Sequence, residues 1–224
     1  YPSSRGLGDV YKRQIPDQKE FWHHGPNIDE TFDKKIPKNL VIDQLPEFNI
    51  YFDELYNELQ KIGINVLSVI AQTIGLNYNF FKPWVEKGNS LLRSIHYPPI
   101  KSLSNLHRAR AHEDINLITL LIGAEEGGLE VLHRDGSWIK VKPSSKAIVC
   151  NIGDMMQLVT DKKLKSTTHR VIQNKAREFN SRYSIPFFLH PAPSVILKSV
   201  FDNCDQGILA SEFLDKRLKE IKLY

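Results

Sequence analysis

A run of short apolar segments between about Leu91 and Leu197 constrains the fold more than any other feature of the chain. The segments are rich in β-branched and aromatic residues, and turn-forming stretches that read HYPP, EEGG, RDG, KPSS and NIGD interrupt them. Several short strands separated by turn signals at this spacing are typical of a β-sandwich or barrel. We therefore expect this stretch to form one mainly β core.

Helical patterns flank the β-rich stretch. Apolar residues recur at helical spacing from Pro46 to Ile74, which predicts one long amphipathic helix with Gly63 as the position for a bend. Its apolar face would consist of Phe48, Tyr51, Phe52, Leu55, Leu59, Ile62, Leu67, Ile70 and Ile74. Near the C-terminus, ASEFLDKRLKEIKLY predicts a covering helix with Ser211 as its N-cap. Its apolar face would consist of Phe213, Leu214, Leu218 and Ile221.

The first fourteen residues are set apart from the fold. Within them, GDVYKRQ resembles a translated sequencing-library adaptor, so we expect residues 1–14 to be read-through rather than native protein. The native sequence would then start near Ile15 and be cut off at its N-terminus, and a missing targeting signal carries no information. The expected organisation is a truncated helical region at 15–90, the β core at 91–197 and a helical extension at 198–224.

Composition narrows the function classes. Hydrophobic residues make up 41% of the chain, enough for one globular domain with a real core, and the formal net charge is +4. Lysine and arginine are scattered, so nothing indicates a nucleic-acid partner, and no apolar stretch approaches the length of a membrane span. Cys150 and Cys204 belong to no paired motif, which favours buried or idle thiols and a cytoplasmic protein. The oligomeric state stays open.

Two histidines have an acidic residue two positions later, namely His112 with Asp114 and His133 with Asp135. Eight histidines and 26 acidic residues in 224 positions produce roughly one such pair by chance, so the spacing alone decides nothing. In AHEDINLITLL no turn dipeptide follows the pair, and alternate residues of an extended chain point the same way. His112 and Asp114 can therefore converge on one metal ion.

The second pair has a different context. In VLHRDGSWIKV, the dipeptide Asp135-Gly136 is a strong hairpin signal between apolar runs at 129–132 and 138–141. We therefore expect the second pair to lie at an exposed turn.

A catalytic metal needs a third ligand from elsewhere in the chain. STTHRVI offers His169 in a β-rich context, after NIGDMMQLV, which we expect to form the intervening strand. Two imidazoles and one carboxylate on one face of an octahedron are the facial triad of non-haem Fe(II) oxygenases. Further on, NSRYSIPFF places Arg182 and Ser184 two apart on an expected strand, and a guanidinium fork with a hydroxyl suits a carboxylate.

In this order, these segments resemble the isopenicillin N synthase-like branch of the Fe(II)- and 2-oxoglutarate-dependent oxygenases, over about residues 15–224. LLRSIHYPP is similar to the family's strand that ends in a Tyr-Pro motif, and GGLEVLHRDGSWIKVKP to its hairpin. NIGDMMQLVTDKKLKSTTHRV is similar to the approach to its distal histidine. The resemblance implies a double-stranded β-helix, or jelly-roll, core with flanking helices. It also implies that His112, Asp114 and His169 bind Fe(II), and that no catalytic residue is needed beyond the metal centre.

The resemblance further implies a co-substrate site. Arg182, Ser184 and Tyr97 would grip the far carboxylate of 2-oxoglutarate. Phe187 and Phe188 are candidates for contacting the substrate, and which of them does so depends on the strand register.

The reaction implied is oxidation of an unidentified small molecule by O2, as hydroxylation or desaturation, with release of succinate and CO2; ascorbate is a further cofactor candidate. Ile95 departs from the family pattern, because plant members often carry an asparagine there. Two alternatives stay open: an isopenicillin N synthase-type or ascorbate-dependent iron oxidase that does not use 2-oxoglutarate, and a non-catalytic jelly-roll binding module. The remaining histidines singled out are expected to be structural: His23, His24, His107, His133 and His190.

Overall fold

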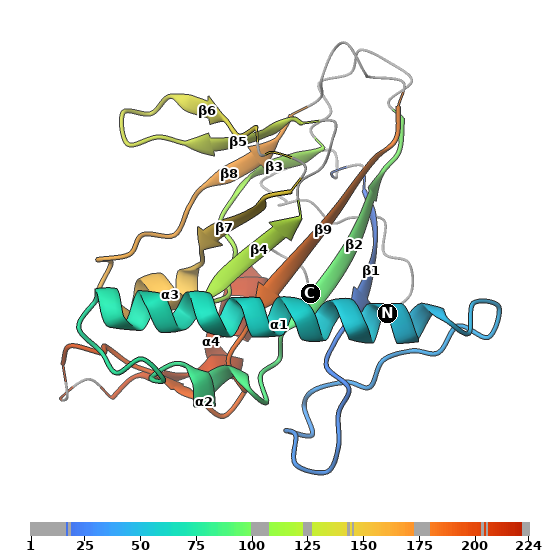
Figure 1. Ribbon diagram of the computed structural model, residues 1–224. Helices are drawn as coiled ribbons and strands as arrows, with labels where there is room; N and C mark the ends of the chain where they lie inside the picture. The colour runs from blue at the N-terminus through green and yellow to red at the C-terminus, as the bar shows by residue number, and fades with distance from the viewer. Residues whose placement is uncertain are drawn as a thin grey trace.

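The computed structural model describes residues 17, 19–99, 108–122, 127–142, 144, 146–172, 180–202, 204 and 206–220. Residues 1–14 and His107 therefore lie outside the described residues. Two antiparallel sheets form the body of the molecule (Figure 1). One is five-stranded, in the order β1 (Glu20–His24), β2 (Leu91–Tyr97), β9 (Arg182–Leu189), β4 (Ile118–Ile122) and β7 (Ile148–Ile152). The other is four-stranded, in the order β3 (Ala109–His112), β8 (His169–Val171), β5 (Leu129–Leu132) and β6 (Trp138–Lys140).

The two sheets pack face to face through a small apolar cluster. Its buried members come from both sheets: Ile95 and Tyr97 from β2, Ala109 from β3, Leu129 from β5 and Val171 from β8. Sheets packed in this way bury alternate residues of each strand between them. This arrangement is the jelly-roll core, and the predicted fold is confirmed. The N-terminal region, expected to be helical, contributes an unpredicted strand, because β1 pairs with β2.

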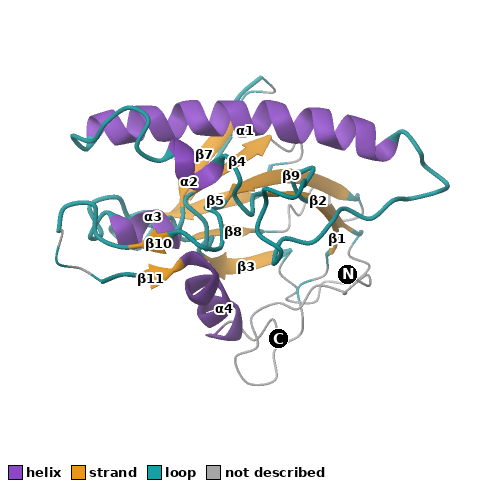
Figure 2. Ribbon diagram, turned by 90° about the horizontal axis from the view of Figure 1, so that it is seen from below, coloured by secondary structure: helices purple, strands orange, loops and turns teal. Residues whose placement is uncertain are grey.

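A larger apolar core begins on the outer face of the five-stranded sheet, under α1 (Phe48–Thr73), and extends to Leu197 and Ala210 near the C-terminus. Figure 2 shows α1 running across this face, with α4 (Ala210–Glu220) on the opposite side of the strands. At Gly63, a Cβ atom would lie 2.9 Å from Leu189 Cδ2 and 3.6 Å from Leu120 Cδ1. The glycine therefore lets an unbroken helix lie close against β4 and β9, and the predicted bend is wrong.

The predicted apolar face of α1 was wrong at two positions. Tyr51 and Ile62 are 61% and 38% exposed. The buried apolar residues of the helix are the predicted Leu59 and Leu67, together with Tyr56 and Ala71, which were not predicted. Contact with the sheet is centred on the line through Gly63, and Tyr51 and Ile62 lie off that line.

The segment NIGDMMQLV was expected to be a strand, but its second half is helix α3 (Asp154–Val159). The first N–H groups of this helix donate to carbonyls of the loop after β3: Asp154 N to Asp114 O at 2.7 Å, and Met155 N to Asn116 O at 3.1 Å. These bonds satisfy donors that have no partner within a helix. They also fix the backbone that carries Asp114.

Two further helices complete the fold. The short α2 (Lys82–Val85) packs beside α1. The C-terminal helix α4 begins at Ala210, so Ser211 lies inside it rather than at its N-cap, and Phe213 and Leu214 pack on the larger core. Just before α4, β10 (Ile196–Leu197) and β11 (Ile208–Leu209) form a two-stranded sheet. Ile221, expected on the apolar face of α4, lies outside the described residues.

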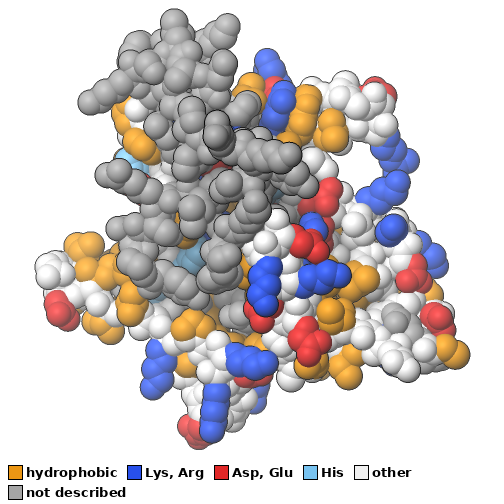
Figure 3. All heavy atoms as spheres, turned by 180° about the vertical axis from the view of Figure 1, so that it is seen from behind, with side chains coloured by type: hydrophobic (Ala, Val, Ile, Leu, Met, Phe, Trp, Pro, Cys, Tyr) orange, Lys and Arg blue, Asp and Glu red, His pale blue; other side chains and the backbone are white. Residues whose placement is uncertain are grey.

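Three further properties of the structure bear on the expectations from the sequence. Cys150 and Cys204 are free and exposed, so of the two alternatives, buried or idle thiols, the buried one was wrong. Within the part of the chain that the structure describes, no helix is both long and apolar enough to span a bilayer. On the face shown in Figure 3, acidic and basic side chains are interspersed.

Candidate metal centre and co-substrate site

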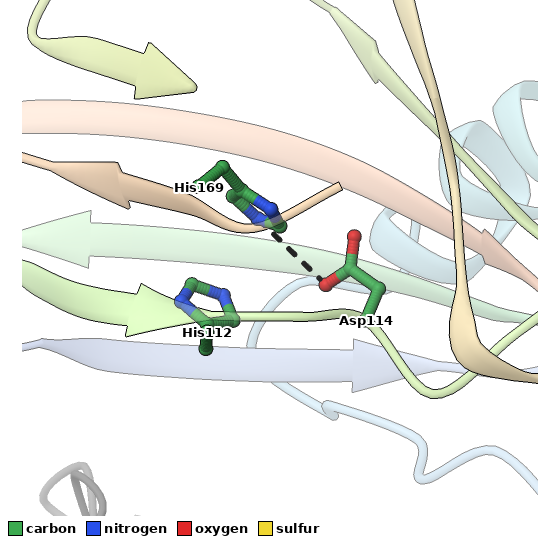
Figure 4. A group of neighbouring side chains, drawn as sticks. All are labelled: His112, Asp114 and His169. Atoms are coloured by element: carbon green, nitrogen blue, oxygen red, sulfur yellow. Dashed lines mark ion pairs between the residues drawn. The ribbon is translucent and has the colours of Figure 1, made fainter. Parts of the chain in front are cut away.

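His112, Asp114 and His169 converge where β3 and β8 pair. His112 and His169 are cross-strand partners in the antiparallel register, and their ring centroids lie 4.3 Å apart. Asp114 lies two residues after the end of β3, and its Oδ1 lies 3.9 Å from His169 Nε2 (Figure 4). One potential ligand atom from each residue lies within 4.8 Å of the others. The structure thus brings together the three residues that the sequence proposed.

Each imidazole is held by a backbone carbonyl two residues earlier in the chain. His112 Nδ1 donates to Arg110 O at 2.6 Å, and His169 Nδ1 donates to Thr167 O at 2.9 Å. A hydrogen on Nδ1 leaves Nε2 of a neutral ring with its lone pair, which is the form that binds a metal. The backbone of the two strands therefore selects the ligating tautomer of both rings.

The Asp114 carboxylate is oriented by two side chains of the five-stranded sheet. Its Oδ2 accepts from Thr119 Oγ1 at 2.6 Å and from Asn151 Nδ2 at 2.9 Å. Asn116 Nδ2 donates to Thr119 Oγ1 at 2.8 Å, so the threonine hydroxyl is directed towards the carboxylate. Oδ1 is left on the side of His169. Sequence reasoning missed these supporting residues, because a threonine five positions after a ligand is not a signal in itself.

The protonation states suit a cation. Burial and the neighbouring His169 together lower the pKa of His112 to about 4, although the charge of Asp114 opposes the shift. Burial alone would raise the pKa of Asp114, but His169, His112 and the two hydrogen bonds together outweigh it and lower that pKa. At neutral pH the site therefore offers a neutral His112 and an ionised carboxylate. Imidazole nitrogens and one carboxylate oxygen are the donors that non-haem iron takes, and the residues present fit that metal.

The three residues expected to grip 2-oxoglutarate are buried together between the sheets. Arg182 and Tyr97 are cross-strand partners on β9 and β2, and the Arg182 guanidinium lies 5.1 Å from the Tyr97 ring centroid. Arg182 Nε donates to Gly127 O at 3.1 Å, which fixes the orientation of the fork. Ser184 lies two residues further on the same face of β9, opposite Ile95. The Ile95 side chain belongs to the apolar cluster between the sheets and offers no polar contact.

The register of β9 separates Phe187 from Phe188. Phe187 is fully buried in the larger core and packs edge-on against Tyr56 of α1 at 5.0 Å. Phe188 lies on the opposite face, which it shares with Arg182 and Ser184. The expectation that Phe187 contacts substrate does not fit this placement, and Phe188 stays the candidate for that contact.

Four other described histidines lie outside the triad, and three of them contact neighbours of their own. His24 pairs with Asp53 at 2.7 Å, and His133 pairs with Asp135 at 3.0 Å at the hairpin turn, as predicted. His23 Nε2 accepts a hydrogen bond from Arg93 Nε at 2.7 Å. His190 is buried, and burial lowers its pKa to about 4. None of these residues joins the triad.

A jelly-roll fold with a buried centre of two histidines and one aspartate defines the class of this protein, and comparison with known proteins agrees. The 2OG-Fe(II) oxygenase superfamily matches residues 88–191. A 2OG-Fe(II) oxygenase family protein from Caulobacter crescentus is 42% identical, with a TM-score of 0.86 over 96% of this chain and 74% of that one. A full-length Neurospora crassa protein in complex with alpha-KG is 27% identical, with a TM-score of 0.81 over 90% and 69% of the two chains. The chain belongs to the 2OG-Fe(II) oxygenase superfamily.

Curated relatives agree on the family but are longer. The 2-oxoglutarate-Fe(II) type oxidoreductase hxnY of Emericella nidulans is 38% identical over 165 residues, which are 72% of this chain and 46% of hxnY. A 2-oxoglutarate-Fe(II) type oxidoreductase of Aspergillus fumigatus is 33% identical over 81% of this chain and 56% of its own length. The chain spans about half the length of these relatives.

Proposed function

We propose that this chain is an Fe(II)- and 2-oxoglutarate-dependent dioxygenase that oxidises a small molecule and releases succinate and CO2. The observation that carries the proposal is the convergence of His112, Asp114 and His169, with both rings fixed through Nδ1 and the carboxylate oriented by two hydrogen bonds. The family supports the choice of metal and co-substrate. Two relatives are named as 2-oxoglutarate-Fe(II) type oxidoreductases, which supports it further.

Different side chains would bind the metal and the co-substrate. His112 and His169 would hold the iron through Nε2, and Asp114 through Oδ1. Three protein ligands on one face leave the remaining positions for 2-oxoglutarate and O2. Bound Fe(II) supplies the redox chemistry, in which O2 is activated while 2-oxoglutarate is oxidatively decarboxylated.

Arg182, Ser184 and Tyr97 would fix the far carboxylate of 2-oxoglutarate. The guanidinium offers a planar fork of donors, and the two hydroxyls offer one donor each. Because Tyr97 and Arg182 are only 3% exposed, the ion pair would form away from bulk water, where it is least screened. The packed sheets around the centre would also limit access of water to the reacting atoms.

The substrate in this proposal is a small molecule that reaches the iron beside Phe188, and its oxidation is a hydroxylation or a desaturation. The Neurospora crassa protein that resembles this chain has also been solved with alpha-KG and thymine, and this supports a small substrate. We also propose a cytoplasmic location, because two exposed free thiols suit a reducing compartment.

Succinate formation from 2-oxoglutarate without added substrate tests the proposed function. The iron-loaded chain should form succinate in air, His169→Ala should form none, and His133→Ala should match the unmodified protein. Full succinate formation by His169→Ala would refute the metal site. Iron binding without succinate formation would favour an oxidase that does not use 2-oxoglutarate.

A further inference from the structure

Arg93 lies on the face of β2 that looks towards the metal centre. Tyr97 and Ile95 of β2 pair with Arg182 and Ser184 of β9 and face the four-stranded sheet. Alternate residues of a strand share a face, so Arg93 lies in the same row as Ile95 and Tyr97. Arg93 is not one of the residues that we propose to bind the metal or 2-oxoglutarate.

The Arg93 guanidinium is held between two aromatic rings. Its Cζ lies 4.8 Å from the ring centroid of Phe21 on β1 and 4.9 Å from that of Phe188 on β9, the strands on either side of β2. Its Nε donates to His23 Nε2 at 2.7 Å. Three side chains thus fix the position of the charge, and among the described residues none accepts a hydrogen bond from the terminal nitrogens of the fork.

No carboxylate in the described part of the chain forms an ion pair with Arg93, although the side chain is partly buried. The charge of Asp114 acts on Arg93 without an ion pair between them, because that carboxylate is held by Thr119 and Asn151 beside His169. A charge removed from water is costly unless a partner of opposite sign satisfies it. The environment of Arg93 is therefore suited to an incoming anion.

The position of Arg93 links it to the reacting centre. Phe188, which contacts the guanidinium, is the cross-strand partner of Thr119 on β4. Thr119 donates in turn to the metal-centre residue Asp114. An anion bound by Arg93 would therefore lie beside the metal centre, with Phe21 and Phe188 as an apolar wall for its carbon skeleton.

We propose that Arg93 binds a carboxylate group of the primary substrate, and that this enzyme oxidises a small carboxylic acid with an apolar body. The inference rests on the proposed function, in which Arg182 rather than Arg93 takes the carboxylate of 2-oxoglutarate. Phe21 and Phe188 position the guanidinium and contact the carbon skeleton. His23 holds Nε, so the terminal nitrogens face the acid.

Matched pairs of acid and amide test the proposal without knowledge of the true substrate. The probes are phenylacetate, 3-phenylpropanoate and cyclohexanecarboxylate, each paired with its neutral primary amide. Calorimetry would measure their binding to the anaerobic Fe(II)-loaded chain with saturating 2-oxoglutarate, and again to the metal-free chain without it. The variants are Arg93→Gln and Arg93→Lys, with Arg182→Gln as the matched control.

At least one acid should bind the unmodified chain about tenfold or more tightly than its amide, because a charged hydrogen bond is lost in the amide. The preference should disappear in Arg93→Gln, persist in part in Arg93→Lys, and persist in metal-free Arg182→Gln. Equal binding of every acid and its amide by the unmodified chain would overturn the proposal, as would a preference that survives Arg93→Gln. Because the metal-free arm needs neither iron nor 2-oxoglutarate, its result is separate from failure of the proposed oxygenase.

Discussion

The chain contains two His-x-Asp pairs of identical spacing, and they have opposite fates. His133 and Asp135 pair with each other at 3.0 Å on an exposed hairpin turn, where their side chains are 49% and 63% exposed. His112 and Asp114 are each held by other residues instead, through Arg110 O on one side and Thr119 with Asn151 on the other. The spacing is the same, but the surroundings differ.

The difference shows what turns a motif into a site. Ligands bind a metal well when neighbouring groups fix their tautomer and orientation. The first pair has such groups from three strands and gains His169 from β8. The hairpin pair has only a turn, in which Asp135 accepts from Ser137 N at 2.8 Å. An exposed ion pair of this kind stabilises the fold only slightly, and the hairpin pair does not form a metal site.

The largest expected effect comes from removing a ligand of the first pair. His112→Ala should abolish binding of Fe(II) and succinate formation, because two ligands hold a catalytic metal poorly. Equilibrium dialysis with Fe(II) under anaerobic conditions measures the first property. His133→Ala is the matched control and should bind iron like the unmodified chain; equal iron binding by both variants would break the comparison.

Removal of the Arg182 guanidinium should have the next largest effect. Arg182→Gln should weaken binding of 2-oxoglutarate about 100-fold, since a charged bidentate contact contributes roughly 3 kcal/mol. Iron binding should be unchanged, because Arg182 does not touch the triad. Calorimetry with 2-oxoglutarate on the iron-loaded chain makes the measurement, and an unchanged affinity would assign the carboxylate to another residue.

Loss of one support of Asp114 should have a smaller effect. Asn151→Leu removes the donor at 2.9 Å and should weaken iron binding about tenfold, since Thr119 still holds the carboxylate. Ser137→Ala at the hairpin pair is the matched control and should change nothing. If both variants bind iron equally well, the support from the five-stranded sheet has no role.

The smallest effect concerns the stability of the metal-free chain. The pKa of His112 is about 4 when folded, against an ordinary value of 6.5, so the unfolded chain takes up this proton first. The contribution of the neutral His112 to the free energy of unfolding is fully present above pH 6.5 and is lost as the pH falls towards 4. Between pH 7.5 and pH 6 the loss in free energy of unfolding should amount to about 1 kcal/mol.

Urea unfolding at these two pH values measures that loss. His112→Gln should lower the stability difference between them, because the buried imidazole is gone. His133→Gln, which removes an exposed ring, should keep the difference seen in the unmodified chain. A pH dependence that is identical in all three proteins would contradict the burial of a neutral His112.

Much of the site could be predicted from the sequence because it depends on local patterns. Residues two apart on an extended chain point the same way, so His112 could be predicted to lie with Asp114, and Arg182 with Ser184. The dipeptide Asp135-Gly136 fixed the hairpin in the same way, and Gly136 has the positive φ of 86° that its turn requires.

Features that depend on distant contacts could not be predicted. The choice between Phe187 and Phe188 needed the position of α1, because the helix defines which face of β9 is the outer one. The supports of Asp114 come from β4 and β7, and no spacing rule joins them to the ligand.

The helices show the same limit. Apolar periodicity could not separate a strand from the short α3, whose first N–H groups bond to the loop after β3. In the sequence, Gly63 indicated a bend in α1. The structure gives another reason for the glycine, because a side chain at this position would collide with Leu189 of β9.

Anaerobic titration of the full chain with Fe(II) and then 2-oxoglutarate tests the central claim most directly, through the weak visible charge-transfer band of a keto acid chelated to iron. We expect the band in the unmodified chain and in His133→Ala, and its loss in His169→Ala and Arg182→Gln. A band of full strength in His169→Ala, or no band in an unmodified chain that binds Fe(II), would contradict the assignment of the metal and co-substrate site.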